Sequence, residues 1–218
     1  MIFLIVYVLY NALTAFGFSV WSVETDAMQS GLRSGDRLIF ASYAIPGLIA
    51  DLKPNGGGLP FRRGDIVLVD SSRSEKDMAS LRIVDGVVRF FTAQRYSLLD
   101  RTGQVYIKRV IGLPGDEISM NNFVFRVRAA RESYSLTEFE MADKPYYPSI
   151  PQVPALWDES IPFSGTMDAV TLGPGECFVV SDNRGATNDS RTWGPIPEET
   201  IRAKAVFRFW PLTRMGRP

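Results

Sequence analysis

The N-terminal segment has no Asp, Glu, Lys or Arg from Met1 to Val23, and Asn11 is its one strongly polar residue. The run MIFLIVYVLYNALTAFGFSVW is 21 residues long. A helix of that length, at about 1.5 Å per residue, crosses a hydrocarbon core of about 30 Å and satisfies its own backbone hydrogen bonds. The segment therefore predicts a single-pass transmembrane helix over residues 1–22.

Two other interpretations of this segment stay open. A cleavable signal peptide normally begins with Lys or Arg and has a shorter apolar stretch, so the sequence argues against it. A helix buried in a soluble core is the second alternative. Charge does not orient an anchor, because the first basic residue of the chain is Arg33.

The composition excludes several classes of protein. The 24 acidic residues balance the 24 basic ones, which argues against a nucleic-acid-binding surface. There is no histidine, so a Ser-His-Asp triad, a Cys-His dyad and His-based zinc sites are excluded. Cys177 is the single cysteine, which excludes an internal disulfide. A hydrolase of this composition would need Lys, Asp or Glu as its base.

Short apolar or alternating runs bounded by Gly, Pro, Asn or Asp predict strands after Glu24. The runs are residues 37–40, 65–69, 105–111, 123–127, 177–180 and 205–210. Gly-Asp pairs precede several strands and indicate turns. Residues 78–99 have helical spacing of apolar side chains and predict one amphipathic helix. The segments 54–60 and 145–162, rich in Gly or Pro, look like insertions in an otherwise all-β body.

Two polar features could carry chemistry. Lys108 follows Tyr106 and Ile107 in a strand-like run; such a lysine either reaches solvent or is buried, and a buried neutral lysine can serve as a general base. Residues 181–197 concentrate Asp, Asn and Arg. That loop either braces the fold through ion pairs or positions catalytic groups.

Together these blocks resemble the type I signal peptidase family. After the apolar run, the chain carries Arg63-Gly64-Asp65-Ile66-Val67, then Lys108-Arg109-x-x-Gly-x-Pro-Gly-Asp, then Asp182-Asn183-Arg184 followed by Asp189-Ser190-Arg191-x-Trp193-Gly194. The order and approximate spacing match the family over most of the chain. The resemblance implies a membrane-anchored serine endopeptidase with a Ser-Lys dyad, which removes signal peptides after Ala-x-Ala.

The resemblance also assigns roles to residues. Lys108 matches the general base, Thr187 the hydroxyl that orients this lysine, Thr25 an oxyanion-hole hydroxyl, and position 27 the nucleophile. The polar loop contributes Asp182, Asn183, Arg184, Asp189, Ser190 and Arg191 as structural residues. No metal or cofactor is implied. The expected partners are preprotein signal peptides and the phospholipid membrane, with no nucleic acid.

The implied fold is mainly β. An antiparallel catalytic core would comprise residues 23–116 and 176–212, and a smaller β cap domain would comprise 117–175. Residues 1–22 would anchor the chain in the cytoplasmic membrane, with the catalytic part on its outer face. Because substrates arrive in the membrane, an exposed apolar strip is expected near Met28, Leu32 and Phe40.

The chain departs from the family at the nucleophile, because position 27 is alanine. A methyl group cannot attack a carbonyl, and loss of a serine nucleophile costs on the order of 10⁶ in rate. Three explanations stay open: an engineered replacement, a natural paralogue that lost the serine, or another hydroxyl acting instead, from Ser22, Ser30 or Ser34. A non-catalytic protein that binds signal peptides is the alternative function.

Overall fold

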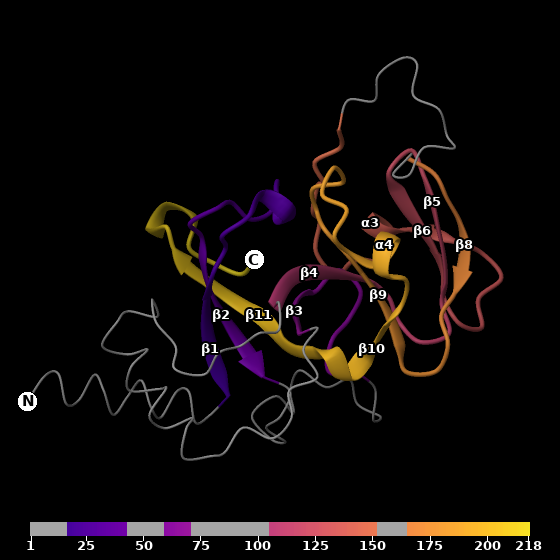
Figure 1. Cartoon of the computed structure of the whole chain (residues 1–218), viewed down its shortest axis with the longest axis horizontal. Helices are drawn as coiled ribbons and strands as arrows, with labels where there is room; N and C mark the ends of the chain where they lie inside the picture. Colours follow the sequence, from indigo (N-terminus) through magenta and orange to yellow (C-terminus); the bar gives the residue numbers. More distant parts are fainter. Residues whose placement is uncertain (1–16, 43–58, 71–104, 152–164) are drawn as a thin grey trace, which may run out of the picture.

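The computed structural model describes residues 17–42, 59–70, 105–151 and 165–218, which form two antiparallel sheets (Figure 1). In order across the larger sheet lie β1 (Phe18–Ser22), β2 (Arg37–Ser42), β11 (Ile201–Trp210), β3 (Ile66–Asp70), β4 (Val105–Gly112), β9 (Glu176–Val180) and β10 (Ile196–Pro197). The smaller sheet contains β7 (Leu136–Thr137), β6 (Val124–Arg128), β5 (Glu117–Asn121) and β8 (Met167–Thr171). Short helical segments are η1 (Asp26–Met28), α3 (Glu138–Met141), α4 (Ser190–Trp193), η3 (Glu198–Thr200) and η4 (Leu212–Arg214).

The mainly β, antiparallel prediction is confirmed. Each of the six runs expected to form strands falls on one of the observed strands, namely β2, β3, β4, β6, β9 and β11. The smaller sheet is built entirely between residues 117 and 171, inside the segment expected to form a cap. The predicted helix over 78–99 lies outside the described residues.

Strand β3 shows why an uninterrupted apolar run becomes a central strand here. Ile66 and Leu68 pack into one apolar cluster, together with β2, β11 and the turn around Met28. Val67 and Val69 pack into another cluster on the opposite face. Both faces of the strand are covered, so its side chains need no alternation between apolar and polar.

The Gly-Asp pairs form one repeated turn, as the sequence predicted. In each pair the glycine has a φ between 86° and 90°, which a residue with a Cβ rarely adopts. The aspartate that follows accepts a hydrogen bond from the backbone N–H three residues earlier, at 2.7 to 3.0 Å. These turns precede β2, β3 and β5, and the pairs are Gly35-Asp36, Gly64-Asp65 and Gly115-Asp116.

A shared apolar cluster joins the two sheets. Ile111 and Phe178 of the larger sheet pack with Ile118 and Phe125 of the smaller one. The rings of Phe125 and Phe178 lie 5.8 Å apart at a tilt of 60°. This contact fixes the smaller sheet beside the end of β4 and β9, close to the polar loop.

The predicted membrane helix over 1–22 is wrong at its C-terminal end. Phe18–Ser22 form the edge strand β1, paired with β2 from Phe18↔Ala41 to Ser22↔Arg37. Residues 1–16 lie outside the described residues. Within the part of the chain that the structure describes, no helix has the length and apolar character to cross a membrane.

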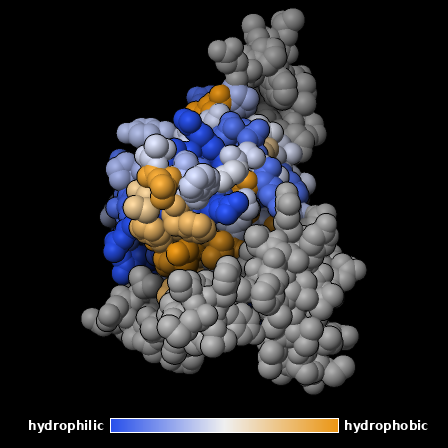
Figure 2. Space-filling view, turned by 90° about the vertical axis from the view of Figure 1, so that its left-hand side faces the viewer, coloured by the Kyte–Doolittle hydropathy of each residue, from blue (hydrophilic) through white to orange (hydrophobic). Residues whose placement is uncertain are grey.

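The expected exposed strip at Met28, Leu32 and Phe40 is also wrong. These side chains are 1%, 0% and 0% exposed, because the turn after β1 folds over the sheet and closes its apolar cluster. The large exposed apolar or aromatic side chains of the described residues are instead Tyr134, Tyr147, Ile150, Trp210, Leu212 and Met215, and the last three lie near the C-terminus. Figure 2, which faces the left-hand side of Figure 1, shows an apolar patch within a largely hydrophilic surface.

Candidate active site

Lys108 is buried within the larger sheet. It lies on β4 opposite Val67 of β3, and 2% of its surface is exposed. Its Nζ donates a 2.8 Å hydrogen bond to Ser181 Oγ. The rings of Tyr106 and Trp193 have their centroids 5.5 and 5.6 Å from the same nitrogen. Of the two alternatives that the sequence left open for this lysine, the structure shows burial.

Burial lowers the pKa of Lys108 from its ordinary value to about 8. The charge of Asp189 raises this pKa, and the charge of Arg191 lowers it, by smaller amounts than burial. A substantial fraction of the side chain is therefore neutral at weakly alkaline pH and can accept a proton. The site thus contains a side chain, other than histidine, that can accept a proton.

Ser181 was missed by the sequence analysis. It follows β9 directly and is 0% exposed. The register of β4 and β9 pairs Arg109 with Val180, so continuing it by one residue places Ser181 opposite Lys108. Its N–H donates to Asp189 Oδ2 at 2.8 Å, and its carbonyl accepts from Arg184 at 2.9 Å. Only the pairing of β4 with β9, had it been deduced from the sequence, would have indicated that Ser181 lies opposite Lys108.

The resemblance assigned the lysine-orienting hydroxyl to Thr187, but the structure joins Lys108 to Ser181. The Thr187 carbonyl accepts hydrogen bonds from the Asp189 N–H at 2.9 Å and from Thr192 Oγ1 at 2.5 Å. These contacts fix its backbone in the loop before α4. An orienting role for the Thr187 hydroxyl stays a prediction.

Asp189 organises the polar loop. It caps α4 by accepting from the Arg191 N–H, and it also accepts from the Arg191 guanidinium at 2.9 and 2.8 Å. Burial would raise the pKa of this carboxyl, but the hydrogen bonds and charge of Arg191 outweigh it and lower the pKa. Ser190 accepts a 3.0 Å hydrogen bond from the Val179 N–H. The loop therefore stabilises the C-terminal end of β9, directly before Ser181.

Asp182 faces the opposite side of the sheet from Ser181. It forms two hydrogen bonds with Arg109, at 2.7 and 2.6 Å, and both side chains are buried. Tyr146 stacks on this guanidinium, with 3.9 Å between the Arg109 carbon and the ring centroid. Lys108 and Arg109 are consecutive residues on β4. The ion pair between Arg109 and Asp182 therefore fixes this strand directly next to the lysine.

Arg184 ties the polar loop to the smaller sheet. Its guanidinium pairs with Glu138 of α3, and both side chains are almost completely buried. Glu138 also accepts from the Tyr146 hydroxyl and from the Phe125 N–H. The same arginine donates to the Ser181 carbonyl. One buried network therefore connects the smaller sheet to the residue that contacts Lys108.

The turn that carries Ala27 is attached to this loop. The Ala27 carbonyl accepts from the Asn183 N–H at 2.9 Å, and the Asn183 side chain donates to the Asp26 carbonyl at 3.3 Å. Met28, buried in the core, anchors the other end of η1. The structure thus brings position 27 next to the residues that follow Ser181, although the two segments are far apart in sequence.

The alternative hydroxyls are engaged elsewhere. Ser30 Oγ donates to the Tyr147 carbonyl, and Ser34 Oγ lies 3.5 Å from the Glu24 carbonyl. Ser22 is exposed at the end of β1. Thr25 precedes η1, is exposed, and makes no side-chain cap hydrogen bond. Its oxyanion role stays a prediction.

Comparisons with known proteins agree on one family. The family described as "Signal peptidase, peptidase S26" matches residues 1–210. "Signal peptidase I" of Bacillus caldolyticus is 29% identical over 210 residues, covering 94% of this chain and 86% of that protein.

Two other relatives match at a comparable level. "Probable signal peptidase I-1" of Synechocystis sp. is 34% identical over 115 residues, 53% of this chain and 47% of that protein. "Signal peptidase I" of Haemophilus influenzae is 26% identical over 239 residues, covering 92% of this chain and 65% of that protein. The match thus reaches about half the length of the Synechocystis relative. Because the family match extends over nearly the whole sequence, the chain belongs to the signal peptidase family, peptidase S26.

Proposed function

We propose that this protein has the catalytic architecture of a type I signal peptidase, and that it is inactive because residue 27 is alanine. Its substrates would be preproteins whose signal peptides end in Ala-x-Ala at the membrane surface. The observation that carries this proposal is Lys108, buried in a protein without histidine and hydrogen-bonded to Ser181. Asn183, two residues after Ser181, donates its N–H to the Ala27 carbonyl.

In the proposed reaction a serine at position 27 would give its hydroxyl proton to neutral Lys108 and attack the carbonyl of the scissile bond. The Thr25 hydroxyl and the N–H of residue 27 would stabilise the oxyanion. Protonated Lys108 would then pass the proton to the leaving amine as the acyl-enzyme forms. The lysine would next take a proton from water, whose oxygen attacks the acyl carbon. Breaking of the acyl bond releases the new carboxyl end, and the lysine returns its proton to the serine oxygen.

Ser181 is unsuited to replace the missing nucleophile. It is hydrogen-bonded to the base, but its surface is 0% exposed, so a scissile carbonyl has no approach to its Oγ. Its side chain fits an orienting role instead. The proposal therefore keeps position 27 as the source of the attacking group.

The test is cleavage of an Ala-x-Ala preprotein by the chain and by Ala27→Ser, both reconstituted in phospholipid vesicles. We expect cleavage by Ala27→Ser alone, and loss of that activity in Ala27→Ser/Lys108→Met. Cleavage by the unaltered chain would contradict the assignment of position 27. Cleavage that persists without Lys108 would contradict the assignment of the base.

The alternative function, a non-catalytic protein that binds signal peptides, is favoured by Ala27 in an otherwise retained site. The same experiment separates the two. If neither chain cleaves the preprotein but both bind its signal peptide, the binding function is the better account.

A further inference from the structure

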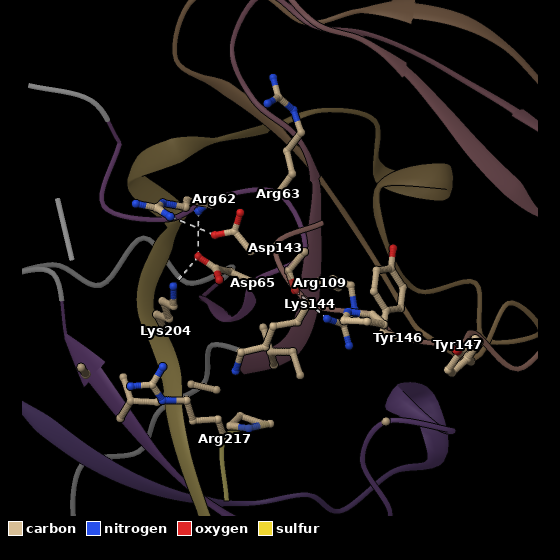
Figure 3. A pocket seen from close by; sticks show the side chains of 18 of the residues that line it. Arg62, Arg63, Asp65, Arg109, Asp143, Lys144, Tyr146, Tyr147, Lys204 and Arg217 are labelled. Carbon is tan, nitrogen blue, oxygen red and sulfur yellow. Dashed lines mark hydrogen bonds and ion pairs between the residues drawn. The ribbon is translucent and has the colours of Figure 1, made fainter. Parts of the chain in front are cut away.

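A groove of about 800 Å³ lies beside the larger sheet, separate from the lysine site. Its walls come from the ends of β1 and β2, from β11, from the turn before β3, and from residues 143–147 (Figure 3). Neither Lys108 nor Ala27 lines it. Ser30, Gly31 and Arg109 do line it, so the groove adjoins the turn of position 27 and the strand of Lys108 without including either residue.

The groove is rich in cations. Six basic side chains line it: Arg62, Arg63, Arg109, Lys144, Lys204 and Arg217. Four of them are paired with carboxylates at 2.6 to 2.9 Å: Arg62 with Asp143, Arg63 with Asp116, Arg109 with Asp182, and Lys204 with Asp65. Within the described residues, Lys144 and Arg217 form no ion pair. The charge of Asp65, which is paired with Lys204, still acts on Lys144, so among the described residues these two cations lack a direct ion-pair partner rather than every nearby counter-charge.

These cations repel one another. Partial burial lowers the pKa of Lys144, and the charges of Arg217 and Lys204 lower it further. A bound anion would remove this repulsion and gain charge-assisted hydrogen bonds from both the ammonium and the guanidinium. The free groove thus favours an anionic ligand on electrostatic grounds.

The shape of the groove adds chemical detail. Lys144 and Arg217 come from different segments of the chain, so an anion with oxygens in several directions suits them better than a planar carboxylate. Another part of the lining is apolar and consists of Phe18, Ala41 and Val206. Phe18 begins β1 and lies within the apolar N-terminal run. The combination fits an amphiphile with a phosphate in its head.

We propose that this groove binds a phosphate group through Lys144 and Arg217, with Phe18, Ala41 and Val206 contacting any apolar portion attached to it. The phosphate could belong to the headgroup of an anionic phospholipid or to a soluble phosphate compound. Both sources present the same oxygens to the two cations. Binding does not depend on peptidase activity, so it is tested on the chain with Ala27 in place.

The experiment is calorimetric titration of the full chain in an uncharged detergent. The probes are inorganic phosphate, dihexanoylphosphatidylglycerol, and dihexanoylphosphatidylcholine as the zwitterionic comparison. Lys144→Gln/Arg217→Gln removes the two unpaired cations of the groove. Its matched control is Arg128→Gln/Arg202→Gln, which removes the same charge from side chains that are 45% and 53% exposed and lie outside the groove.

We expect saturable binding of phosphate or of the anionic lipid, at least about tenfold weaker in the groove variant and nearly unchanged in the control. Lys144→Arg/Arg217→Lys, which keeps both charges, should restore most of the affinity. Binding of the anionic lipid alone identifies a headgroup; equal affinity for inorganic phosphate identifies a soluble ligand. The proposal is overturned if neither probe saturates, if acetate competes as well as phosphate, or if both double variants weaken binding alike.

Discussion

At the scale of single residues, the pairing of Lys108 with Ser181 sets the chemistry of the site. A neutral amine that donates one N–H to Ser181 Oγ keeps its lone pair for a proton from another group. Ser181 is itself held at both ends of its backbone, by Asp189 and Arg184. The base is thus positioned by a residue whose own place is fixed through the polar loop.

Replacement of Ser181 by alanine tests this positioning role. In the Ala27→Ser background, Ser181→Ala should lower kcat by about tenfold or more, with KM nearly unchanged, because the lysine loses the contact that orients it. Ser34→Ala, which removes an exposed hydroxyl away from the lysine, is the control. The readout is steady-state cleavage of a preprotein. An unaltered kcat in Ser181→Ala would leave the orienting role to Thr187.

The pH dependence of Ala27→Ser should report the pKa of Lys108. The base must be neutral, and its neutral fraction grows as pH rises through about 8. We therefore expect kcat/KM to increase from pH 6.5 and level off above the pKa of the free lysine. Cleavage rates at subsaturating substrate across this range give the midpoint. A rate that falls as pH rises from 7 to 9 would be incompatible with lysine as the base.

At the scale of elements, the sequence predicted the strands well because their boundaries are local. Glycine turns with a bonded aspartate start β2, β3 and β5, and apolar runs between them form the strands. The edge strand β1 was missed because its residues continue the apolar N-terminal run. Apolar content alone does not separate a strand covered on one side from the end of a membrane helix.

The ion pair between Arg184 and Glu138 should be the main polar link between the two sheets. Glu138→Gln should lower the free energy of unfolding by about 3 kcal/mol, because the Arg184 guanidinium is then buried without a counter-charge. Glu117→Gln breaks the exposed pair with Arg128 and should cost less than about 1 kcal/mol. Urea unfolding of both variants in detergent measures the difference. Equal losses would show that the buried pair has no special weight.

At the scale of the whole molecule, three of the six large exposed apolar or aromatic side chains of the described residues lie near the C-terminus. Trp210, Leu212 and Met215 are 50%, 67% and 57% exposed. Nearby, Arg208 and Arg214 donate to the Gly31 carbonyl, in the turn that follows η1. This part of the surface therefore lies beside the segment that carries position 27, where a membrane-borne substrate would have to arrive.

Membrane contact at this patch can be tested separately from any contribution of residues 1–16. A chain that begins at Gly17 should bind phospholipid vesicles, and Trp210→Ser/Leu212→Ser/Met215→Ser should weaken that binding at least about tenfold, because it removes the exposed apolar side chains near the C-terminus. Tyr134→Ser, which changes a side chain 57% exposed near the smaller sheet, is the control. Cosedimentation with vesicles is the measurement. Equal binding by all three chains would show that the patch does not face the bilayer.

The sequence by itself determined the features that depend on neighbouring residues. The absence of histidine restricted the base to other residues, and the local apolar context of Lys108 made its burial one of two outcomes. The strands and the Gly-Asp turns follow from short patterns in the same way, whereas the polar loop had two possible roles until the structure showed its ion pairs. Family resemblance then marked Ala27 as the position where the chain departs.

Tertiary structure alone decided which distant residues meet. Ser181 reaches Lys108 because the register of β4 and β9 places them opposite each other, and register depends on packing across the sheet rather than on either strand. Met28, Leu32 and Phe40 are covered because the turn after β1 folds back over the sheet. The groove around Lys144 and Arg217 is lined by segments from both ends of the chain, so it could not be predicted from the order of residues in the sequence.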